Sequence, residues 1–196
     1  MKIRKVSEEL VLPKSGIKGT EVKKSQGYSK IYLAGPDVFR SNAISRLNSL
    51  KRFAERYGHR GLAPLDNVLN IADSEKGTPK HATLIFEANV DLIEECDVII
   101  ANLEPFRGPS IDDGTAWEIG YGYARGKKIY GYSALSDKSL EEITKMMFDM
   151  SKQTKYPNIE KMGHSVNLMI QDSIVASGGK IFKTFEECLI DLNKPL

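Results

Sequence analysis

The sequence is poor in cysteine and histidine, and it has no long apolar run. Its two cysteines, Cys96 and Cys188, form no CxxC pair and, with only 3 histidines in the chain, do not support a structural zinc site. No stretch approaches the roughly 20 apolar residues of a transmembrane helix. Residues 1–10 are basic and lack the apolar core of a secretory signal peptide. We therefore expect a cytoplasmic protein with reduced, buried thiols and no membrane partner.

Three motifs that are common in nucleotide-binding and hydrolytic enzymes are also absent. No GxGxxG follows the first predicted strand, which argues against a dinucleotide fingerprint. The sequence contains neither a GxxxxGK[ST] phosphate loop nor a GxSxG nucleophile elbow. Any chemistry must therefore depend on other side chains.

The composition suits a single folded domain that follows a basic segment. The chain has 196 residues, of which 41% are hydrophobic and 28% are charged. Residues 1–30 hold 8 Lys+Arg and 3 Asp+Glu, whereas the rest of the chain holds 20 and 23. Tyr28 is the single aromatic residue of this basic segment, so we expect no nucleic acid partner. We expect residues 1–28 to be a flexible leader and residues 29–196 to form the domain.

Apolar runs alternate with stretches of helical periodicity along the rest of the chain. The runs predict strands at 30–34, 60–64, 97–103, 127–132 and 180–182. The helical stretches lie at 41–57, from Thr78-Pro79 onward, at 115–125, near 138–150, and at 163–176 and 184–192. This alternation predicts an α/β fold, a single doubly wound (flavodoxin-like) domain. We expect a parallel sheet of about five strands with helices on both faces.

Ligands of such folds bind beyond the carboxyl ends of the strands. The polar segments that follow the first three predicted strands are therefore the expected site. They are Gly35-Pro36-Asp37, Asp66-Asn67 and residues 107–113.

Three carboxylates, Asp112, Asp113 and Glu118, stand at the start of one predicted helix. A purely structural interpretation is available, because Asp113 has the chemistry of a helix cap. Thr115 and Glu118 also have the spacing of a capping box, in which the Glu118 carboxylate accepts from the Thr115 amide.

Small and aromatic residues surround these carboxylates. Gly114 and Gly120 are expected to let the helix approach the sheet and to leave room for a ligand. Phe39 and Trp117 have the chemistry to sandwich a base, although we expect Trp117 to pack in the core.

Three segments together resemble the nucleoside 2-deoxyribosyltransferase family. The first is Tyr32-Leu-Ala-Gly-Pro-Asp-Val-Phe39. The second is Asp112-x-Gly-Thr-Ala-x-Glu118-x-Gly, followed by Ala124-x-Gly-Lys127, and the third is Asn167-Leu-Met169. The order and spacing of these segments match the family over residues 30–175.

The resemblance implies roles for particular residues. Glu118 is the implied nucleophile, Tyr32 orients it through its hydroxyl, and Asp112 binds sugar hydroxyls. The remaining implied substrate-binding residues are Gly35, Pro36, Asp37, Phe39, Gly114, Asn167 and Met169.

The residue that contacts the base is left open by the sequence. The family often has Asp where Asn89 aligns, and Asp91 lies two residues further along, so either side chain is a candidate. The leaving base also needs a proton, for which Asp91 and Asp112 are candidates by position.

The resemblance implies transfer of 2-deoxyribose between nucleobases through a covalent deoxyribosyl-Glu118 intermediate, with retention. The expected partners are deoxynucleosides, free purine or pyrimidine bases and further copies of the chain with shared active sites. No metal or organic cofactor is expected, because a carboxylate nucleophile and a proton donor suffice. Two alternatives remain: an N-glycosidase that hydrolyses deoxynucleosides or their 5′-phosphates, and a non-catalytic sensor of nucleoside-type ligands.

Overall fold

The structure, a computed structural model, describes residues 27–66, 76–149, 152, 155 and 157–195. Most of the predicted leader lies outside these residues, and so does Asn67 of the polar segment Asp66-Asn67. The elements are β1 (Lys30–Ala34), η1 (Pro36–Phe39), α1 (Ala43–Arg56), β2 (Arg60–Leu62), η2 (Pro64–Asp66), α2 (Pro79–Glu95), β3 (Val98–Asn102), α3 (Asp113–Ala124), β4 (Lys128–Tyr132), α4 (Leu140–Met147), α5 (Leu168–Ala176), β5 (Ile181–Phe182) and α6 (Phe185–Leu192).

The five strands form one sheet in the order β2-β1-β3-β4-β5, and every neighbouring pair is parallel. The chain moves outward from β1 to β2 and then returns to β3 on the other side of β1. This reversal places the topological switch point between β1 and β3, where doubly wound folds bind ligands. The predicted fold class is therefore confirmed.

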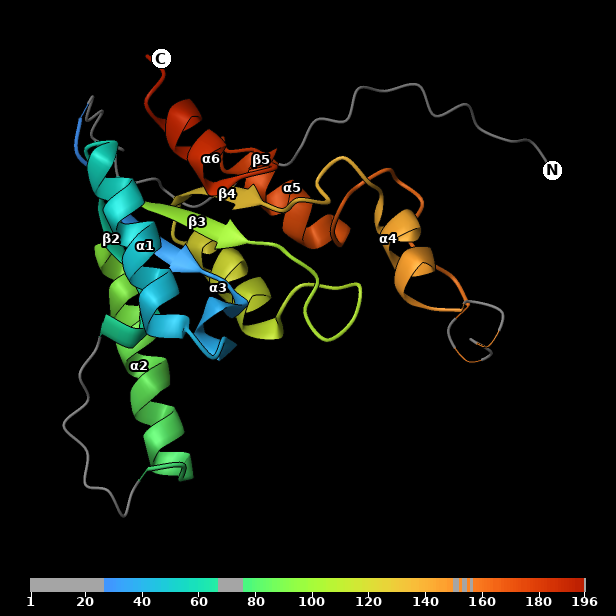
Figure 1. Ribbon diagram of the computed structural model, residues 1–196, viewed down its shortest axis with the longest axis horizontal. Coiled ribbons are helices and arrows are strands. Elements are labelled where there is room, and N and C mark those ends of the chain that lie inside the picture. The colour runs from blue at the N-terminus through green and yellow to red at the C-terminus, as the bar shows by residue number, and fades with distance from the viewer. Residues whose placement is uncertain (1–26, 67–75, 150–151, 153–154, 156, 196) are drawn as a thin grey trace.

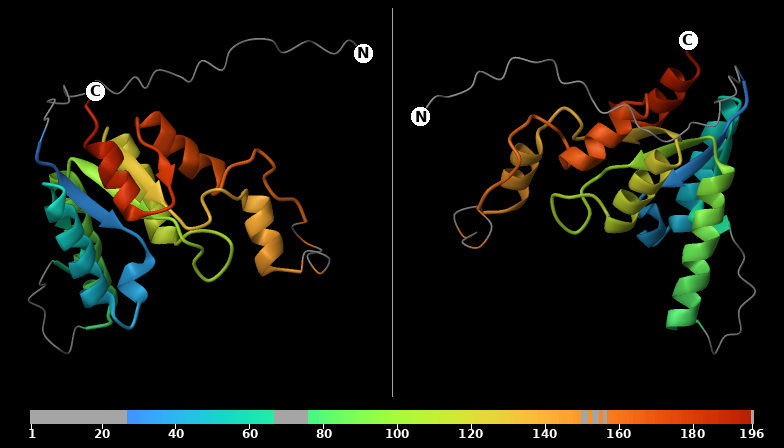
Figure 2. Two further views of the ribbon diagram at one scale, coloured as in Figure 1. Left: turned by 45° about the horizontal axis from the view of Figure 1, so that its top comes forward. Right: turned by 180° about the vertical axis from the view of Figure 1, so that it is seen from behind.

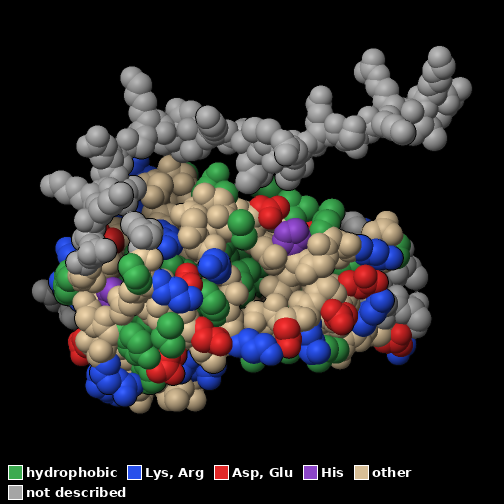
Figure 3. Space-filling view, turned by 90° about the horizontal axis from the view of Figure 1, so that it is seen from above, with side chains coloured by type: hydrophobic (Ala, Val, Ile, Leu, Met, Phe, Trp, Pro, Cys, Tyr) green, Lys and Arg blue, Asp and Glu red, His purple; other side chains and the backbone are tan. Residues whose placement is uncertain are grey.

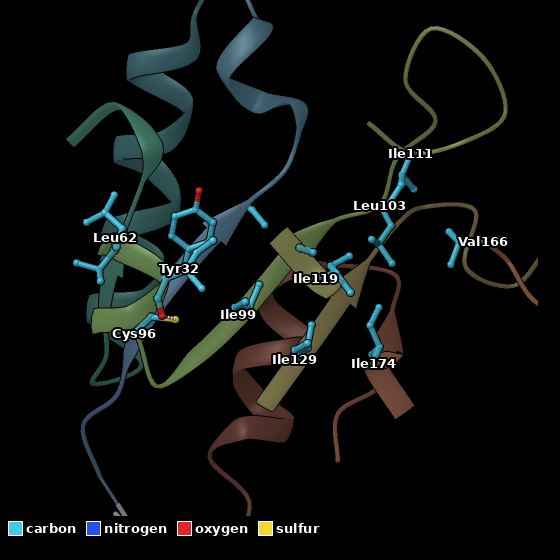
Figure 4. Packing of buried hydrophobic residues seen from close by; sticks show 14 residues of the cluster. Tyr32, Leu62, Cys96, Ile99, Leu103, Ile111, Ile119, Ile129, Val166 and Ile174 are labelled. Carbon is cyan, nitrogen blue, oxygen red and sulfur yellow. Dashed lines mark hydrogen bonds between the residues drawn. The ribbon is translucent and has the colours of Figure 1, made fainter. Parts of the chain in front are cut away.

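Helices cover both faces of the sheet, and each face has its own apolar core (Figures 1 and 2). One core packs the sheet against α2, α3 and α5, and Figure 4 shows it from close by. The other core packs the sheet against α1 and α6. Short α4 is set apart from the sheet beyond the ends of β3 and β4 (Figure 1).

The predicted start of α2 was correct. Thr78 caps α2 by accepting from the His81 amide, and Pro79 takes the first helical position. The predicted helix at 163–176 begins later, because Asn167 caps α5 instead. Ile44 in α1 and Ile85 in α2 fit the apolar periodicity of their helices, yet both are exposed.

The surface has a mixed charge pattern on the face that Figure 3 shows. Lys and Arg side chains alternate there with Asp and Glu side chains. Among the described residues, no helix is long and apolar enough to cross a membrane.

Candidate active site

Tyr32 and Glu118 meet although 86 residues separate them in sequence. Tyr32 is fully buried in β1, and its hydroxyl donates to Glu118 Oε1 at 2.5 Å. Figure 4 shows the Tyr32 ring within the core, with its hydroxyl pointing away from Cys96. The contact that the sequence analysis expected between Tyr32 and Glu118 is therefore present.

The surroundings of Glu118 favour its protonated form more than water does. Burial is the main cause and raises the pKa of Glu118 to about 7. The hydrogen bond from Tyr32 opposes this rise, and the negative charge of Asp112 adds to it. Burial and the Glu118 charge also raise the pKa of the Tyr32 hydroxyl, which therefore keeps its proton and donates. The Glu118 carboxyl thus changes charge near neutral pH.

Asp112 begins the helix that carries Glu118. Its Oδ2 accepts from the Thr115 amide at 3.0 Å and from the Thr115 hydroxyl at 3.1 Å, so Asp112 is the N-cap. The expected cap, Asp113, is instead the first residue of α3. The capping box of Thr115 and Glu118 does not form, because Glu118 is bonded to Tyr32 from the sheet.

Glu118 lies at the wall of a small pocket between α2 and α3. This Glu118 pocket has a volume of about 280 Å³ and is lined by Phe86, Asn89, Gly114, Trp117 and Glu118. Asn89 Oδ1 is buried there without a hydrogen-bond partner. A buried amide oxygen without a partner costs free energy, so it favours a ligand that brings a donor.

The aromatic walls of the Glu118 pocket differ from expectation. Trp117 is 45% exposed rather than packed in the core, and its ring stacks on Tyr121 with centroids 5.0 Å apart. Phe86, which the sequence analysis missed, contacts Trp117 edge to face. Phe86 could have been identified from the sequence by its position three residues before Asn89, because that spacing places both side chains on one face of α2.

Of the two glycines singled out in α3, Gly114 lines the pocket as expected and Gly120 does not approach the sheet. Gly114 lines the Glu118 pocket, where a Cβ would lie 3.1 Å from Asp112 Oδ2. A Cβ at Gly120 would meet nothing within 4 Å, so Gly120 makes no close approach. Gly122 approaches the sheet instead, because its Cβ would lie 2.2 Å from Ile99 Cδ1.

The segment after β1 lies at the same edge of the sheet but outside the Glu118 pocket lining. Gly35 is required by close packing, since its φ is +140° and a Cβ would lie 2.6 Å from the Asn102 Cβ. Pro36 starts η1 and is buried. Asp37 is 3% exposed and accepts from Arg40 Nε.

Phe39, at the end of the same segment, is 58% exposed and stacks on Phe106. The Arg107 guanidinium lies 5.4 Å from the Phe39 ring centroid and 4.6 Å from that of Phe106. Phe39 and Trp117 therefore do not stand as two walls of one pocket in the single chain.

Three other candidate residues also lie outside the Glu118 pocket lining. Asp91 is exposed on α2. Asn167 caps α5 and donates to Glu160, and Met169 is 70% exposed. Of the two candidates for the base contact, Asn89 lines the pocket and Asp91 does not.

Comparison with known proteins gives one family. The family model described as nucleoside 2-deoxyribosyltransferase matches residues 31–169, which include every motif quoted above. An uncharacterised protein of Schizosaccharomyces pombe is 38% identical over 104 residues. That match covers 53% of this chain and 49% of the yeast protein, so the chain spans about half the length of this curated relative.

Solved structures show the same architecture. A 2-deoxyribosyltransferase from Leishmania mexicana is 30% identical with a TM-score of 0.64, and the match covers 84% of this chain and 96% of that one. A 2-deoxyribosyltransferase from Bacillus psychrosaccharolyticus is 23% identical with a TM-score of 0.54, covering 85% and 92%. The second likeness concerns the fold alone.

Proposed function

The chain belongs to the nucleoside 2-deoxyribosyltransferase family, and from this we propose that it transfers 2-deoxyribose between nucleobases, with Glu118 as the nucleophile. The family consists of enzymes that act on nucleosides. One observation carries the proposal: the Tyr32 hydroxyl donates to one oxygen of the half-buried Glu118 carboxylate at the wall of a pocket.

The reaction proceeds in two balanced substitutions. In the first, a Glu118 oxygen forms a bond to the anomeric carbon of the nucleoside, and the bond from that carbon to the base nitrogen breaks. The base leaves with the electron pair and takes up one proton. In the second, a ring nitrogen of another base attacks the same carbon, loses its proton and releases the Glu118 carboxylate. Two inversions give retention overall.

The contact with Tyr32 suits this chemistry. Because Tyr32 donates to Oε1, Oε2 is the oxygen available for attack. The raised pKa of Glu118 means that the carboxylate is less stabilised by its surroundings than in water, which favours bond formation to carbon.

Asn89 and Asp112 bind opposite ends of the substrate in this proposal. The unpartnered Asn89 Oδ1 accepts from an exocyclic amino group on the base edge, which adenine, cytosine and guanine carry. Asp112 faces Glu118 closely enough to influence its pKa and accepts from the sugar hydroxyls.

Hydrolysis is the second candidate, and the exposure of the pocket favours it. Phe86 and Trp117 are each about half exposed in the single chain, so water reaches the pocket that holds Glu118. A water molecule that replaces the second base yields free deoxyribose.

An assay with deoxyadenosine and free cytosine separates the two reactions. Transfer yields deoxycytidine and adenine, whereas hydrolysis yields deoxyribose and adenine. Glu118→Ala is expected to lower the rate by at least about a thousandfold, equivalent to about 4 kcal/mol in the barrier. Labelling of Glu118 with one deoxyribosyl group, located by mass spectrometry, is the positive counterpart. Near-normal turnover by Glu118→Ala, with the fold intact, would remove Glu118 from the mechanism.

We also propose that a second copy of the chain completes the site. Asn167 and Met169 are exposed at the start of α5 and do not line the Glu118 pocket of their own chain. A neighbouring copy is expected to bring them to the sugar, where the Asn167 amide can bind a hydroxyl.

A further inference from the structure

A second and larger cleft lies between α1 and α6, on the face of the sheet opposite to the Glu118 pocket. This α1–α6 cleft has a volume of about 610 Å³, within the range of small-molecule sites. It opens at the edge where the strands end, because Asn102 ends β3 and Tyr132 ends β4. The side chains around it are Arg40, Arg46, Leu50, Phe53, Asn102, Glu104, Tyr132, Lys183, Thr184, Phe185 and Glu186.

Two arginines of the α1–α6 cleft share a single carboxylate oxygen. Arg40 Nε donates to Asp37 Oδ1 at 2.8 Å, and Arg46 Nε donates to the same oxygen at 3.3 Å. Two guanidinium charges therefore face one carboxylate charge, which leaves an excess of one positive charge at this wall. Arg40 has four further N–H donors, and Arg46, which also bonds to the Tyr132 hydroxyl, has three, in the fork geometry that binds phosphate.

The group that holds the two arginines is itself fixed in the fold. Asp37 is 3% exposed, and its Oδ2 accepts from Asn102 Nδ2 at 2.8 Å and from the Tyr132 hydroxyl at 3.5 Å. Asn102 and Tyr132 belong to the central strands β3 and β4. The arginine pair therefore stands on a buried polar network and is held in place before a ligand arrives.

The other walls fit the rest of a nucleotide. The aromatic rings of Phe53 and Phe185 offer apolar surface to a planar base. The carboxylates of Glu104 and Glu186 accept from the Ala134 amide and the Tyr57 hydroxyl, and each retains lone pairs for ribose hydroxyls or a ring amino group. The lysine of the cleft, Lys183, is paired with Asp137.

From this combination we propose that the α1–α6 cleft is a second ligand site, which binds a nucleoside 5′-phosphate with its phosphate on Arg40 and Arg46. The α1–α6 cleft shares no lining residue with the Glu118 pocket. The site is therefore separate from the catalytic chemistry, and it stands whether the enzyme transfers or hydrolyses.

Binding and location are measured separately in the test. Equilibrium dialysis of the full chain, carrying Glu118→Gln to prevent turnover, measures the affinity for deoxyadenosine 5′-phosphate, deoxyadenosine and inorganic phosphate. Trp117, the single tryptophan of the chain, lines the Glu118 pocket, so its fluorescence reports occupancy there and not in the α1–α6 cleft. Arg40→Ala and Arg46→Ala remove the phosphate contacts one at a time.

Arg125→Ala is the matched control, since the Arg125 side chain is 52% exposed and paired with a carboxylate, as Arg40 is at 53%, but lies outside the α1–α6 cleft. We expect one molecule of nucleotide to bind in the α1–α6 cleft, and this binding event by itself should leave Trp117 fluorescence unchanged. Arg40→Ala and Arg46→Ala should each weaken its binding at least tenfold, and Arg125→Ala should leave it unchanged. Phosphate alone should bind more weakly than the nucleotide, because it lacks the base contacts.

Three results would overturn the proposal. The first is the absence of any binding outside the Glu118 pocket with folded protein. The second is nucleotide binding that quenches Trp117 and ignores both arginine variants. The third is equal affinity for phosphate and the nucleotide, which would reduce the site to one for simple anions. If Arg46→Ala fails to fold, Arg40→Ala still decides the matter, because Arg46 continues to neutralise Asp37 in that variant.

Discussion

The Tyr32–Glu118 contact joins a strand residue to a helix residue, and burial raises the pKa of both side chains. Glu118 is half-buried and loses part of its stabilisation by water, which raises its pKa. The Tyr32 hydroxyl replaces part of that stabilisation by donating at 2.5 Å. The pair therefore sets the pH range in which the carboxylate is available for chemistry.

The acid limb of the pH profile of kcat/KM is expected to reflect the ionisation of Glu118. Because the pKa of Glu118 is raised to about 7 and the nucleophile must be ionised, kcat/KM should rise with pH through neutrality. Tyr32→Phe removes a hydrogen bond that lowers this pKa, so the limb should move to higher pH. Steady-state kinetics from about pH 5 to about pH 9 measures the shift.

Tyr57→Phe is the control for this experiment, since the Tyr57 hydroxyl donates to Glu186 on the opposite face of the sheet. It should leave the limb in place. A limb that Tyr32→Phe leaves unmoved, or moves to lower pH, would show that another group controls the profile.

The residues that the sequence misplaced have one physical reason in common. Asp112 rather than Asp113 caps α3, and the spacing of Thr115 and Glu118 gives no capping box. A local pattern describes what neighbouring residues offer one another, whereas Glu118 is engaged by Tyr32 from a distant strand. Asp37 is paired with Arg40, three residues along the chain, and with Arg46, and its role in substrate binding stays a prediction.

At the scale of elements, the close approach of α3 to the sheet depends on Gly122 having no side chain. A Cβ at Gly122 would lie 2.2 Å from Ile99 Cδ1 in the core. Gly122→Ala must therefore push α3 from the sheet or displace Ile99, and we expect the free energy of unfolding to fall by about 1–3 kcal/mol. Urea denaturation measures the change.

Gly120→Ala on the same helix provides the comparison, because a Cβ there meets nothing within 4 Å. Alanine has the higher helix propensity, so this variant should be about 0.4–1 kcal/mol more stable. Equal losses of stability in both variants would mean that the packing of α3 does not decide the outcome.

Most elements could be predicted because their signals are local. The strands are short apolar runs, and the caps Thr78 and Thr184 stand one residue before their helices. The helix predicted from residue 163 begins at Leu168, since Asn167 caps it by accepting from the Met169 amide. Ile44 and Ile85 fit the periodicity of their helices but lie on faces that the sheet does not cover.

At the scale of the whole molecule, mixing two inactive variants tests the shared site. Glu118→Ala and Asn167→Ala each damage a different contributor if Asn167 crosses to a neighbour. In a mixed dimer, one site then carries both lesions and the other carries neither, so about a quarter of the normal activity should return after random exchange. The transfer assay on the exchanged mixture measures it.

Glu118→Ala mixed with Glu118→Gln is the control, because no arrangement of these chains gives an intact site. It should recover no activity. The same lack of recovery with Asn167→Ala, after native mass spectrometry has shown exchanged subunits, would contradict the shared site.

The α1–α6 cleft could not be predicted from the sequence, although its parts are in it. Arg40 and Arg46 follow the first strand, whereas Phe185 and Glu186 belong to the last helix. These residues come together because α6 packs on the same face of the sheet as α1. The order of strands determines which distant segments meet, and the sequence pattern predicts only that helices cover both faces.

The alkylation rates of the two buried cysteines report separately how often each of the two helical layers opens. Cys96 belongs to the core beneath α2, α3 and α5, whereas Cys188 belongs to the core beneath α1 and α6. A thiol reagent reaches either one only when its layer opens. Cys188 lies in α6, a helix of 8 residues beside the two-residue edge strand β5. Cys96 follows α2, a helix of 17 residues. Because the shorter elements are expected to open more readily, Cys188 should be modified first. Peptide mapping of alkylated protein over time measures both rates, and identical rates would mean that the layers open as one cooperative unit.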